Sequence, residues 1–395
     1  MKKIVYLCGM MLLCMNMMAQ QRNQKGHDTS RYSHGKHYKH LDIEYRASRM
    51  DLTPGWRYDS VLSDEFDSPV INTARWKIKH KKYFSNEYNV GFMNRPENVR
   101  IQNGELVLSV TTNDEDVWCQ PSWGSGDSVR PYLMSGWLTS KKDSRYGYIE
   151  TECYLPKNHH YWPCFWTTGR DTINDDYDEV DVFERTATHD TDYPYMIRQN
   201  CYNGAGTTHE SFISSILTMA NHDSITGRTS VFGVEILPEE VVFYINGHVT
   251  GHLKYHESMG NDRNTYTHTD IEEMIRMFFV LSLTCPKTQH TLPLPVESAK
   301  FKYMRCYKLE RGNVDTYHPT VFVPSDESTK VYPHVILGGN GCTASITTPT
   351  AIWAEQDIIL DKGFEVSAGT SFSARVISVP NPARSPLYIQ NCHRH

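Results

Sequence analysis

A segment near the middle of the chain alternates acidic with apolar side chains, from Asp178 to Glu184. In a regular strand Glu179 and Asp181 lie on one face, and Glu184 falls on the other because side chains alternate. A one-residue bulge at Val182-Phe183 would return Glu184 to the first face. The sequence therefore predicts three carboxylates on one side of a bulged strand, where like charges raise one another's pKa values.

Carboxylates in this arrangement can hydrolyse a glycosidic bond. A deprotonated carboxylate attacks the anomeric carbon, while a protonated one delivers a proton to the leaving oxygen. Glu179 and Glu184 suit these two roles, and Asp181 between them can hold or share a proton. In a chain with 46 acidic residues, three acids on an edge strand can equally be a solvated face or a calcium site.

Tryptophans are candidates for substrate contacts, because sugars present apolar C–H faces that stack on aromatic rings. Trp162 and Trp166 share strand parity with Cys164, and Trp137 lies at the entry of another expected strand. Core packing is the alternative interpretation for each of the three rings.

A basic cluster follows Trp76 and contains Lys77, Lys79, His80, Lys81 and Lys82. Such a cluster is usually a solvated face, although a sulfated or uronic polymer could use it. Asp175, Asp176 and Asp178 beside Glu179 argue against strong anions at the point of cleavage.

The elements that must position these residues are short strands separated by turns. Apolar alternation predicts strands at 105–111, 148–155, 241–245, 277–283 and 301–309, and Asn246-Gly247 predicts a hairpin turn. Only 270–276 suggests a helix. Many short strands without intervening helices indicate an all-β fold, a β-sandwich or jelly roll.

Composition excludes several classes of protein. The chain has 395 residues, of which 22% are charged and 39% hydrophobic, so extended disorder is ruled out. With 40 basic and 46 acidic residues the net charge is −6, so we expect no nucleic-acid partner. Its cysteines lack CxxC spacing, which argues against zinc. Buried free thiols are the simplest expectation, although export would permit disulfides.

The first 19 residues are typical of a signal peptide. Lys2 and Lys3 precede an apolar run, Ile4–Met18, that is shorter than the ~20 residues needed to span a bilayer, and Ala19 is a small residue at the cleavage position. We expect export to the periplasm, cell surface or medium. A lipoprotein signal at Cys14 is the alternative.

The remaining chain divides into three parts. Residues 20–50 are polar and lack periodicity, which predicts a linker, and residues 51–312 hold the strands described above. A stretch rich in proline and glycine then precedes strand-like pieces at 358–360 and 372–376. Residues 313–395 are therefore expected to form a small, separate β-rich module that takes no part in catalysis. Trp353 in this module is either its core or a sugar-stacking residue.

Motifs along residues 56–310 resemble glycoside hydrolase family 16, in the laminarinase- and agarase-like branch that carries a bulged Glu-x-Asp-x-x-Glu strand. Besides Glu179–Glu184, they are Ser63–Asp67 with Trp76, Asn98–Arg100, Asn103–Leu108, Ser135-Gly136, Tyr146–Glu150, Trp162–Trp166, Val234–Gly247 and Tyr303–Tyr307. The resemblance implies a concanavalin A-like jelly roll with Glu179 as nucleophile, Asp181 as its partner and Glu184 as acid/base. It also implies a polysaccharide substrate and a reaction that requires no cofactor.

Some residues depart from the family pattern. Asn174 and Asp175 stand where many β-1,3-glucanases have Trp-Pro, which puts glucan specificity in doubt. Lys302 replaces an aspartate that often helps to bind a structural calcium, and a cation there is repelled. Glu152 stands where the family often has arginine.

Together these observations predict a secreted, monomeric, endo-acting and retaining β-glycanase without a membrane span. It would hydrolyse internal β-1,3 or β-1,4 linkages of a neutral glucan or galactan by double displacement. The rival hypothesis is a catalytically silent carbohydrate-binding protein that uses the same cleft.

Overall fold

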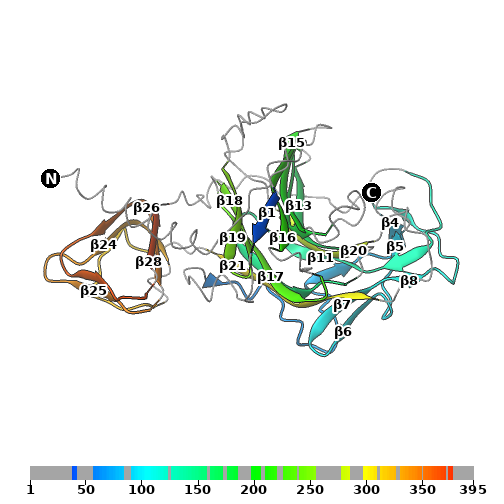
Figure 1. Ribbon diagram of the computed structural model, residues 1–395, viewed down its shortest axis with the longest axis horizontal. Helices are drawn as coiled ribbons and strands as arrows, with labels where there is room; N and C mark the ends of the chain where they lie inside the picture. Colours follow the sequence, from blue (N-terminus) through cyan, green and yellow to red (C-terminus); the bar gives the residue numbers. More distant parts are fainter. Residues whose placement is uncertain are drawn as a thin grey trace.

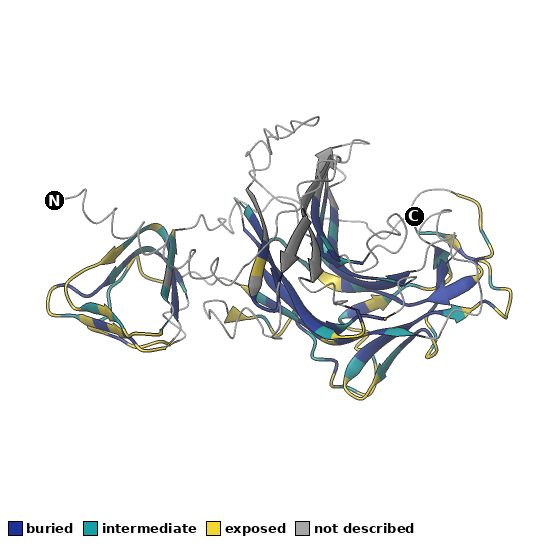
Figure 2. Ribbon diagram, viewed as in Figure 1, coloured by how far each residue is buried: buried dark blue, intermediate teal, exposed yellow. Residues whose placement is uncertain are grey.

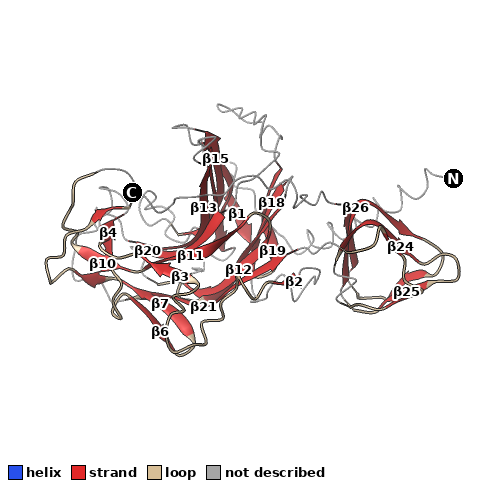
Figure 3. Cartoon of the chain, turned by 180° about the vertical axis from the view of Figure 1, so that it is seen from behind, coloured by secondary structure: helices blue, strands red, loops and turns tan. Residues whose placement is uncertain are grey.

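The computed structural model describes residues 38–41, 57–83, 90–122, 126–157, 161–171, 176–185, 197–205, 210–219, 226–237, 240–254, 277–284, 297–308, 312–325, 330–348, 350–370 and 372–376. Within these ranges every regular element is a β-strand, as Figure 3 shows. The all-β prediction is confirmed. The leader expected at 1–19 and the helix expected at 270–276 lie outside the described residues.

One eight-stranded sheet, here called the front sheet, carries the acidic segment. Its order is β1 (Tyr38–Leu41), β16 (Glu210–Met219), β15 (Ile197–Ala205), β14 (Asp176–Glu184), β13 (Trp162–Asp171), β20 (Met277–Thr284), β11 (Trp137–Ser144) and β3 (Trp76–Ile78). All neighbours are antiparallel except β1 and β16.

A second eight-stranded sheet, the back sheet, lies against the first (Figure 1). Its path is β19 (His248–Lys254), β18 (Glu240–Ile245), β17 (Thr229–Ile236), β12 (Gly147–Tyr154), β21 (Ser298–Lys308), β7 (Glu105–Ser109) and β6 (Val99–Gln102), and β2 (Arg57–Tyr58) pairs with β21. Asn246 and Gly247 turn the β18–β19 hairpin with φ of 48° and 78°, as their types predict.

A smaller five-stranded sheet flanks the sandwich. It comprises β8 (Thr111–Thr112), β10 (Leu133–Ser135), β5 (Val90–Phe92), β4 (Lys82–Tyr83) and β9 (Gln120–Pro121).

The core fills the space between the front and back sheets, where Figure 2 shows the buried faces in dark blue. Phe183 of β14 packs on Phe232 of β17 with ring centroids 4.3 Å apart. Val180 and Leu281 from the front sheet join Phe301 from the back sheet in the same cluster. Alternation along each strand therefore sends one set of side chains into a shared core, as a jelly-roll sandwich requires.

Strand β1 lies within the segment that the sequence marked as a polar linker. Residues 38–41 pair in parallel with Ile216–Met219 of β16 at the edge of the front sheet. Ladder hydrogen bonds come from the backbone, so an edge strand can form without the apolar alternation on which the linker prediction depended.

The C-terminal module winds in successive coils that each add a strand to two parallel sheets. One sheet is β22 (Thr316–Tyr317), β24 (Val331–Leu337), β26 (Thr350–Leu360) and β28 (Phe372–Val376), and the other is β23 (Val321–Phe322), β25 (Thr343–Ile346) and β27 (Phe364–Val366). Thr316 pairs with His334, and His334 pairs with Asp357, so coil length varies. This variation hides the repeat from a search for a fixed period.

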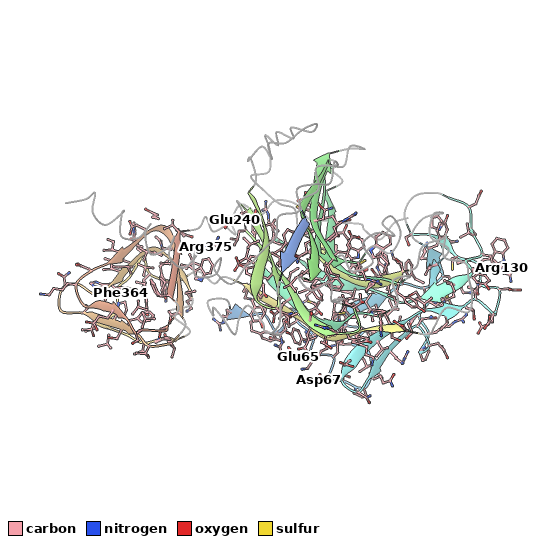
Figure 4. The ribbon with its side chains drawn as sticks, viewed as in Figure 1. Glu65, Asp67, Arg130, Glu240, Phe364 and Arg375 are labelled. Atoms are coloured by element: carbon pink, nitrogen blue, oxygen red, sulfur yellow. The ribbon has the colours of Figure 1, made fainter. Side chains whose placement is uncertain are left out.

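Side chains of the C-terminal module cover part of the outer face of the back sheet. Trp353 of β26, 1% exposed, packs in one cluster with Tyr148 of β12 and Tyr244 of β18. Beside it, Arg375 of β28 pairs with Glu235 of β17 at 3.2 Å and with Glu240 of β18. Figure 4 labels Arg375 and Glu240 at this junction. Trp353 is therefore a core residue of the contact between the two parts.

Among the described residues, cysteines are free thiols rather than disulfides. Five are buried, Cys119, Cys153, Cys164, Cys201 and Cys306, and Cys342 is half-buried. Cys285 and Cys392 lie outside the described residues. No helix in the described ranges is long and apolar enough to cross a bilayer.

Candidate active site

Strand β14 carries the three acids, and its bulge lies where the alternation predicts it. Asp181 and Phe183 pair with consecutive residues of β13, so Val182 is the extra residue. The pairing with β15 also shifts between Asp181 and Glu184. Val182 and Phe183 are both fully buried. Two successive side chains thus point into the core, and Glu184 returns to the face of Glu179.

These acids line one open pocket with an empty volume of about 390 Å³. This volume includes space that is open to solvent. The structure brings together all six residues predicted for the site and adds three others, so that the lining is Trp137, Trp162, Cys164, Trp166, Glu179, Asp181, Glu184, Ser282 and Thr284. They come from the adjacent strands β14, β13, β20 and β11 of the front sheet.

The tryptophans combine core packing with a place in the pocket wall. Trp137 and Trp166 meet edge to face with centroids 5.4 Å apart, and they are 2% and 7% exposed. Trp166 donates a hydrogen bond from Nε1 to Ser282 Oγ at 3.3 Å, which fixes its ring. Trp162 is only half-buried and also packs against the core. Of the three rings, Trp162 therefore keeps the largest exposed fraction for a sugar.

The electrostatics of the pocket favour a shared proton. Desolvation raises the pKa of Asp181 well above its ordinary value, and the charges of Glu184 and Glu179 raise it further. Desolvation also raises the pKa of Glu184, although the Arg198 guanidinium opposes this. A hydrogen bond between the two side chains raises the pKa of Asp181 and lowers that of Glu184, as expected when Asp181 is the donor. These effects favour the protonated form of Asp181 next to Glu184, and Glu179 is the third, partly exposed acid.

Arg198 is a pocket-side residue that the sequence did not reveal. It lies on β15 directly across from Glu184 in the strand ladder. Its positive charge stabilises the ionised form of Glu184 and so limits the rise of that pKa. A single arginine in a strand carries no pattern, so only the pairing of β14 with β15 identifies it.

Cys164 lies in the pocket wall and pairs with Glu184 across the β13–β14 ladder. Burial raises the pKa of its thiol well above the ordinary value, and the charges of Glu184 and Asp181 raise it further. Cys164 is therefore a neutral thiol at physiological pH and is unsuited to act as a nucleophile. The sequence indicated the position of Cys164, because it shares strand parity with Trp162 and Trp166. No comparable pattern in the sequence indicated Ser282 and Thr284.

One of the acids expected to repel anions does not face the pocket. Asp178 is fully buried, and strand alternation places it on the face opposite Glu179. The expectation that Asp178 contributes to an acidic cleft is wrong, because the bulge follows it and leaves its parity unchanged. Asn174 and Asp175 lie outside the described residues.

The structural calcium implied by the family resemblance does not fit the residues present. The Lys302 Nζ lies 3.6 Å from Glu152 Oε2, and the Glu152 side chain is only 9% exposed. A lysine ammonium therefore supplies the positive charge beside this carboxylate and would repel a divalent cation. Lys302 and Glu152, which both depart from the family pattern, form an ion pair with each other, and this explains why they occur together.

Part of the chain matches the model of a known protein family. Residues 84–277 match the model for glycosyl hydrolases family 16, and this segment contains all three pocket acids. No curated protein matches the sequence.

Among solved structures, three similar folds illustrate the likeness. A structure from work on endo-acting O-glycanases with which human gut bacteria initiate mucin breakdown is 19% identical, with a TM-score of 0.51 over 67% of this chain and 93% of that one. Porphyranase B from Zobellia galactanivorans is 17% identical, with a TM-score of 0.50 over 66% and 98% of the two chains. The kappa-carrageenase from Pseudoalteromonas carrageenovora is 17% identical, with a TM-score of 0.50 over 65% and 96%. At these identities the likeness concerns the fold.

Proposed function

Because the chain belongs to glycosyl hydrolases family 16 and is a glycosidase, we propose that it is an endo-acting, retaining β-glycanase. Its substrate would be a glucan or galactan cleaved at internal β-1,3 or β-1,4 linkages. The single observation that carries this proposal is the row of three carboxyl groups in one open pocket, with tryptophans in its wall.

Each acid has a distinct role in double displacement. Glu179 attacks the anomeric carbon as Glu184 protonates the leaving oxygen, which forms a glycosyl-enzyme ester and breaks the glycosidic bond. Glu184 then removes a proton from water, and the resulting oxygen nucleophile displaces Glu179. Asp181 holds a proton beside Glu184. When Glu184 loses its own proton to the leaving oxygen, the pair therefore carries one negative charge and not two.

The electrostatics also bear on the sugar at the point of cleavage. Three carboxyl groups face the pocket, so an anionic substituent on the sugars next to the broken bond would be repelled. We therefore expect these two sugars to be uncharged.

The test uses Glu179→Gln with Glu97→Gln as control, since Glu97 is exposed on the same domain. Both proteins are incubated with a panel of β-glucans and β-galactans, and released oligosaccharides are analysed over time. We expect Glu179→Gln to lose hydrolysis while its melting temperature is unchanged or higher, because a like charge is removed. Early products should be mixed oligosaccharides with the β-configuration retained at the new reducing end.

Two outcomes would count against the proposal. Undiminished hydrolysis by Glu179→Gln would remove Glu179 from the reaction. Binding without release on every polymer would instead favour a catalytically silent carbohydrate-binding protein.

We further propose that the protein is exported after cleavage near Ala19 and acts as a monomer without a cofactor. The basic start and apolar run of the leader support export. Amino-terminal sequencing of the native protein and its mass in solution would test the two proposals.

A further inference from the structure

Two lysines of the basic cluster after Trp76 lie on the same face of the front sheet as the pocket. In the β3–β11 ladder, Lys77 lies opposite Thr139, and the Lys79 backbone N–H donates to the Trp137 carbonyl at 3.0 Å. Trp76 is buried in the sandwich core, so alternation sends Lys77 and Lys79 to the opposite, outer face. The Trp137 Nε1 donates to Thr139 Oγ1 on that face at 3.0 Å.

Lys79 is held against an aromatic wall rather than extended into solvent. Its Nζ lies 3.5 Å from the centroid of Trp137 and 5.7 Å from that of Phe92. Trp137 in turn meets Trp166, and both rings line the pocket of the three acids. Two ring contacts therefore connect the Lys79 ammonium with the wall of the candidate active site.

Trp137 itself offers little surface to a sugar, because it is only 2% exposed. The half-buried Lys79 and the exposed Lys77 are the groups that this end of the sheet presents. Among described residues, the face thus has carboxyl groups at its centre on β14 and ammonium groups at its edge on β3. Asp178 faces the core and not this edge of the sheet.

Resting on the glycanase function proposed above, we propose that Lys77 and Lys79 form an outer subsite for an anionic substituent of the polysaccharide. The substituent is a sulfate ester or a carboxylate on a sugar bound beyond the point of cleavage. The acidic centre and the basic edge together select a chain that is neutral where it is cut and charged farther along.

Burial and neighbouring charges affect the protonation of Lys79. Desolvation lowers the pKa of Lys79 well below its ordinary value, and the charges of Lys77 and Lys82 lower it further. Both effects favour the neutral amine, and a bound anion would counter them by stabilising the charged ammonium.

The test compares matched polymers with one backbone. One pair is a sulfated β-galactan and its desulfated form, and the other is a uronic-acid-containing β-glycan and its carboxyl-reduced form. Wild type, Lys79→Gln, Lys77→Gln and the control Lys82→Gln are compared by kcat/KM at low salt. Lys82 belongs to the same basic cluster but donates to Gln120 Oε1 in the five-stranded sheet.

We expect wild type to prefer one charged polymer over its neutral partner by about tenfold or more, the scale of a charge-assisted hydrogen bond. Lys79→Gln should remove most of this preference and Lys77→Gln should reduce it. Lys82→Gln should keep or strengthen it, because loss of the Lys82 charge favours the charged form of Lys79. The polymer pair that shows the preference distinguishes sulfate from carboxylate.

Either of two results would overturn the subsite. Wild type could cleave charged and neutral partners equally well, or Lys79→Gln could lower kcat/KM on both by the same factor, which would mean that Lys79 only positions Trp137. Dissociation constants of the same polymers with Glu179→Gln give the comparison without turnover. A charge preference in binding without any hydrolysis by wild type would refute the glycanase and keep the subsite.

Discussion

Arg375 should hold the C-terminal module to the sandwich, and replacing it with methionine tests this directly. Arg375 lies beside Trp353 in the β26–β28 ladder, with its guanidinium carbon 5.5 Å from that ring. It contacts Glu235, whose side chain is 0% exposed, and Glu240, whose side chain is 14% exposed. Methionine preserves much of the apolar stem but leaves two carboxylates close together without the guanidinium.

The magnitude follows from the burial of these partners. Removing one member of a buried ion pair costs about 3 to 5 kcal/mol. The Arg375 side chain is 32% exposed, so water screens part of the interaction and lowers the expected loss. We expect Arg375→Met to reduce the free energy of unfolding by about 2 to 3 kcal/mol. Glu235→Gln in the same background should restore about 1 to 2 kcal/mol, because the two residues are coupled.

The assay is a double-mutant cycle of Arg375→Met and Glu235→Gln. Urea unfolding gives the free energies, and hydrogen exchange of the β26 and β28 amides shows whether the module loosens. Arg130→Met is the matched control, since Arg130 pairs with Asp116 but both side chains are more than half exposed. It should change stability by less than about 0.5 kcal/mol. Additive effects of the two substitutions, or a loss for Arg375→Met as small as the control's, would refute the reasoning.

Three further predictions concern the pocket, the calcium position and the module. The raised pKa of Asp181 means that its contribution to stability is complete below its ordinary value of 3.8 and is lost as pH rises through the raised value. Asp181→Asn should therefore gain melting temperature relative to wild type as pH rises above 3.8, and a difference independent of pH would contradict this. Calcium or a chelator should not shift the melting temperature, because Lys302 supplies the charge beside Glu152; a rise with added calcium would show that the ion binds. A chain ending after Arg311 should keep its kcat on a soluble oligosaccharide, since none of the module's described residues lines the pocket. The shortened chain should melt at a lower temperature, because Tyr148 loses its packing against the module. An unchanged melting temperature would show that the docked module adds no stability.

Local patterns determined much of the candidate site. Alternation fixed Glu179 and Asp181 on one face, and the requirement for a third carboxylate on that face predicted the bulge at Val182-Phe183. These features depend on the period of a single strand, which is two residues whatever the rest of the chain does. The parity of Trp162 and Trp166 was readable for the same reason.

The all-β class was also readable, but its internal arrangement was not. Short alternating segments with turns predict strands, whereas strand order depends on contacts between segments far apart in sequence. The coils of the C-terminal module could not be predicted from a fixed repeat, because their lengths differ. Strand β1 could not be predicted from apolar alternation, because an edge strand can form from backbone hydrogen bonds alone.

The sequence by itself determined which residues share a face of one strand, and so it supplied the three acids, the bulge and the family resemblance. Only the tertiary structure decided which faces meet. Arg198 opposite Glu184, Lys79 over Trp137, Lys302 beside Glu152 and Arg375 against Glu235 each join residues from different strands. The physical reason is that a side chain's charge acts over a few ångströms of space, and neighbours in space are set by the pairing and packing of whole sheets.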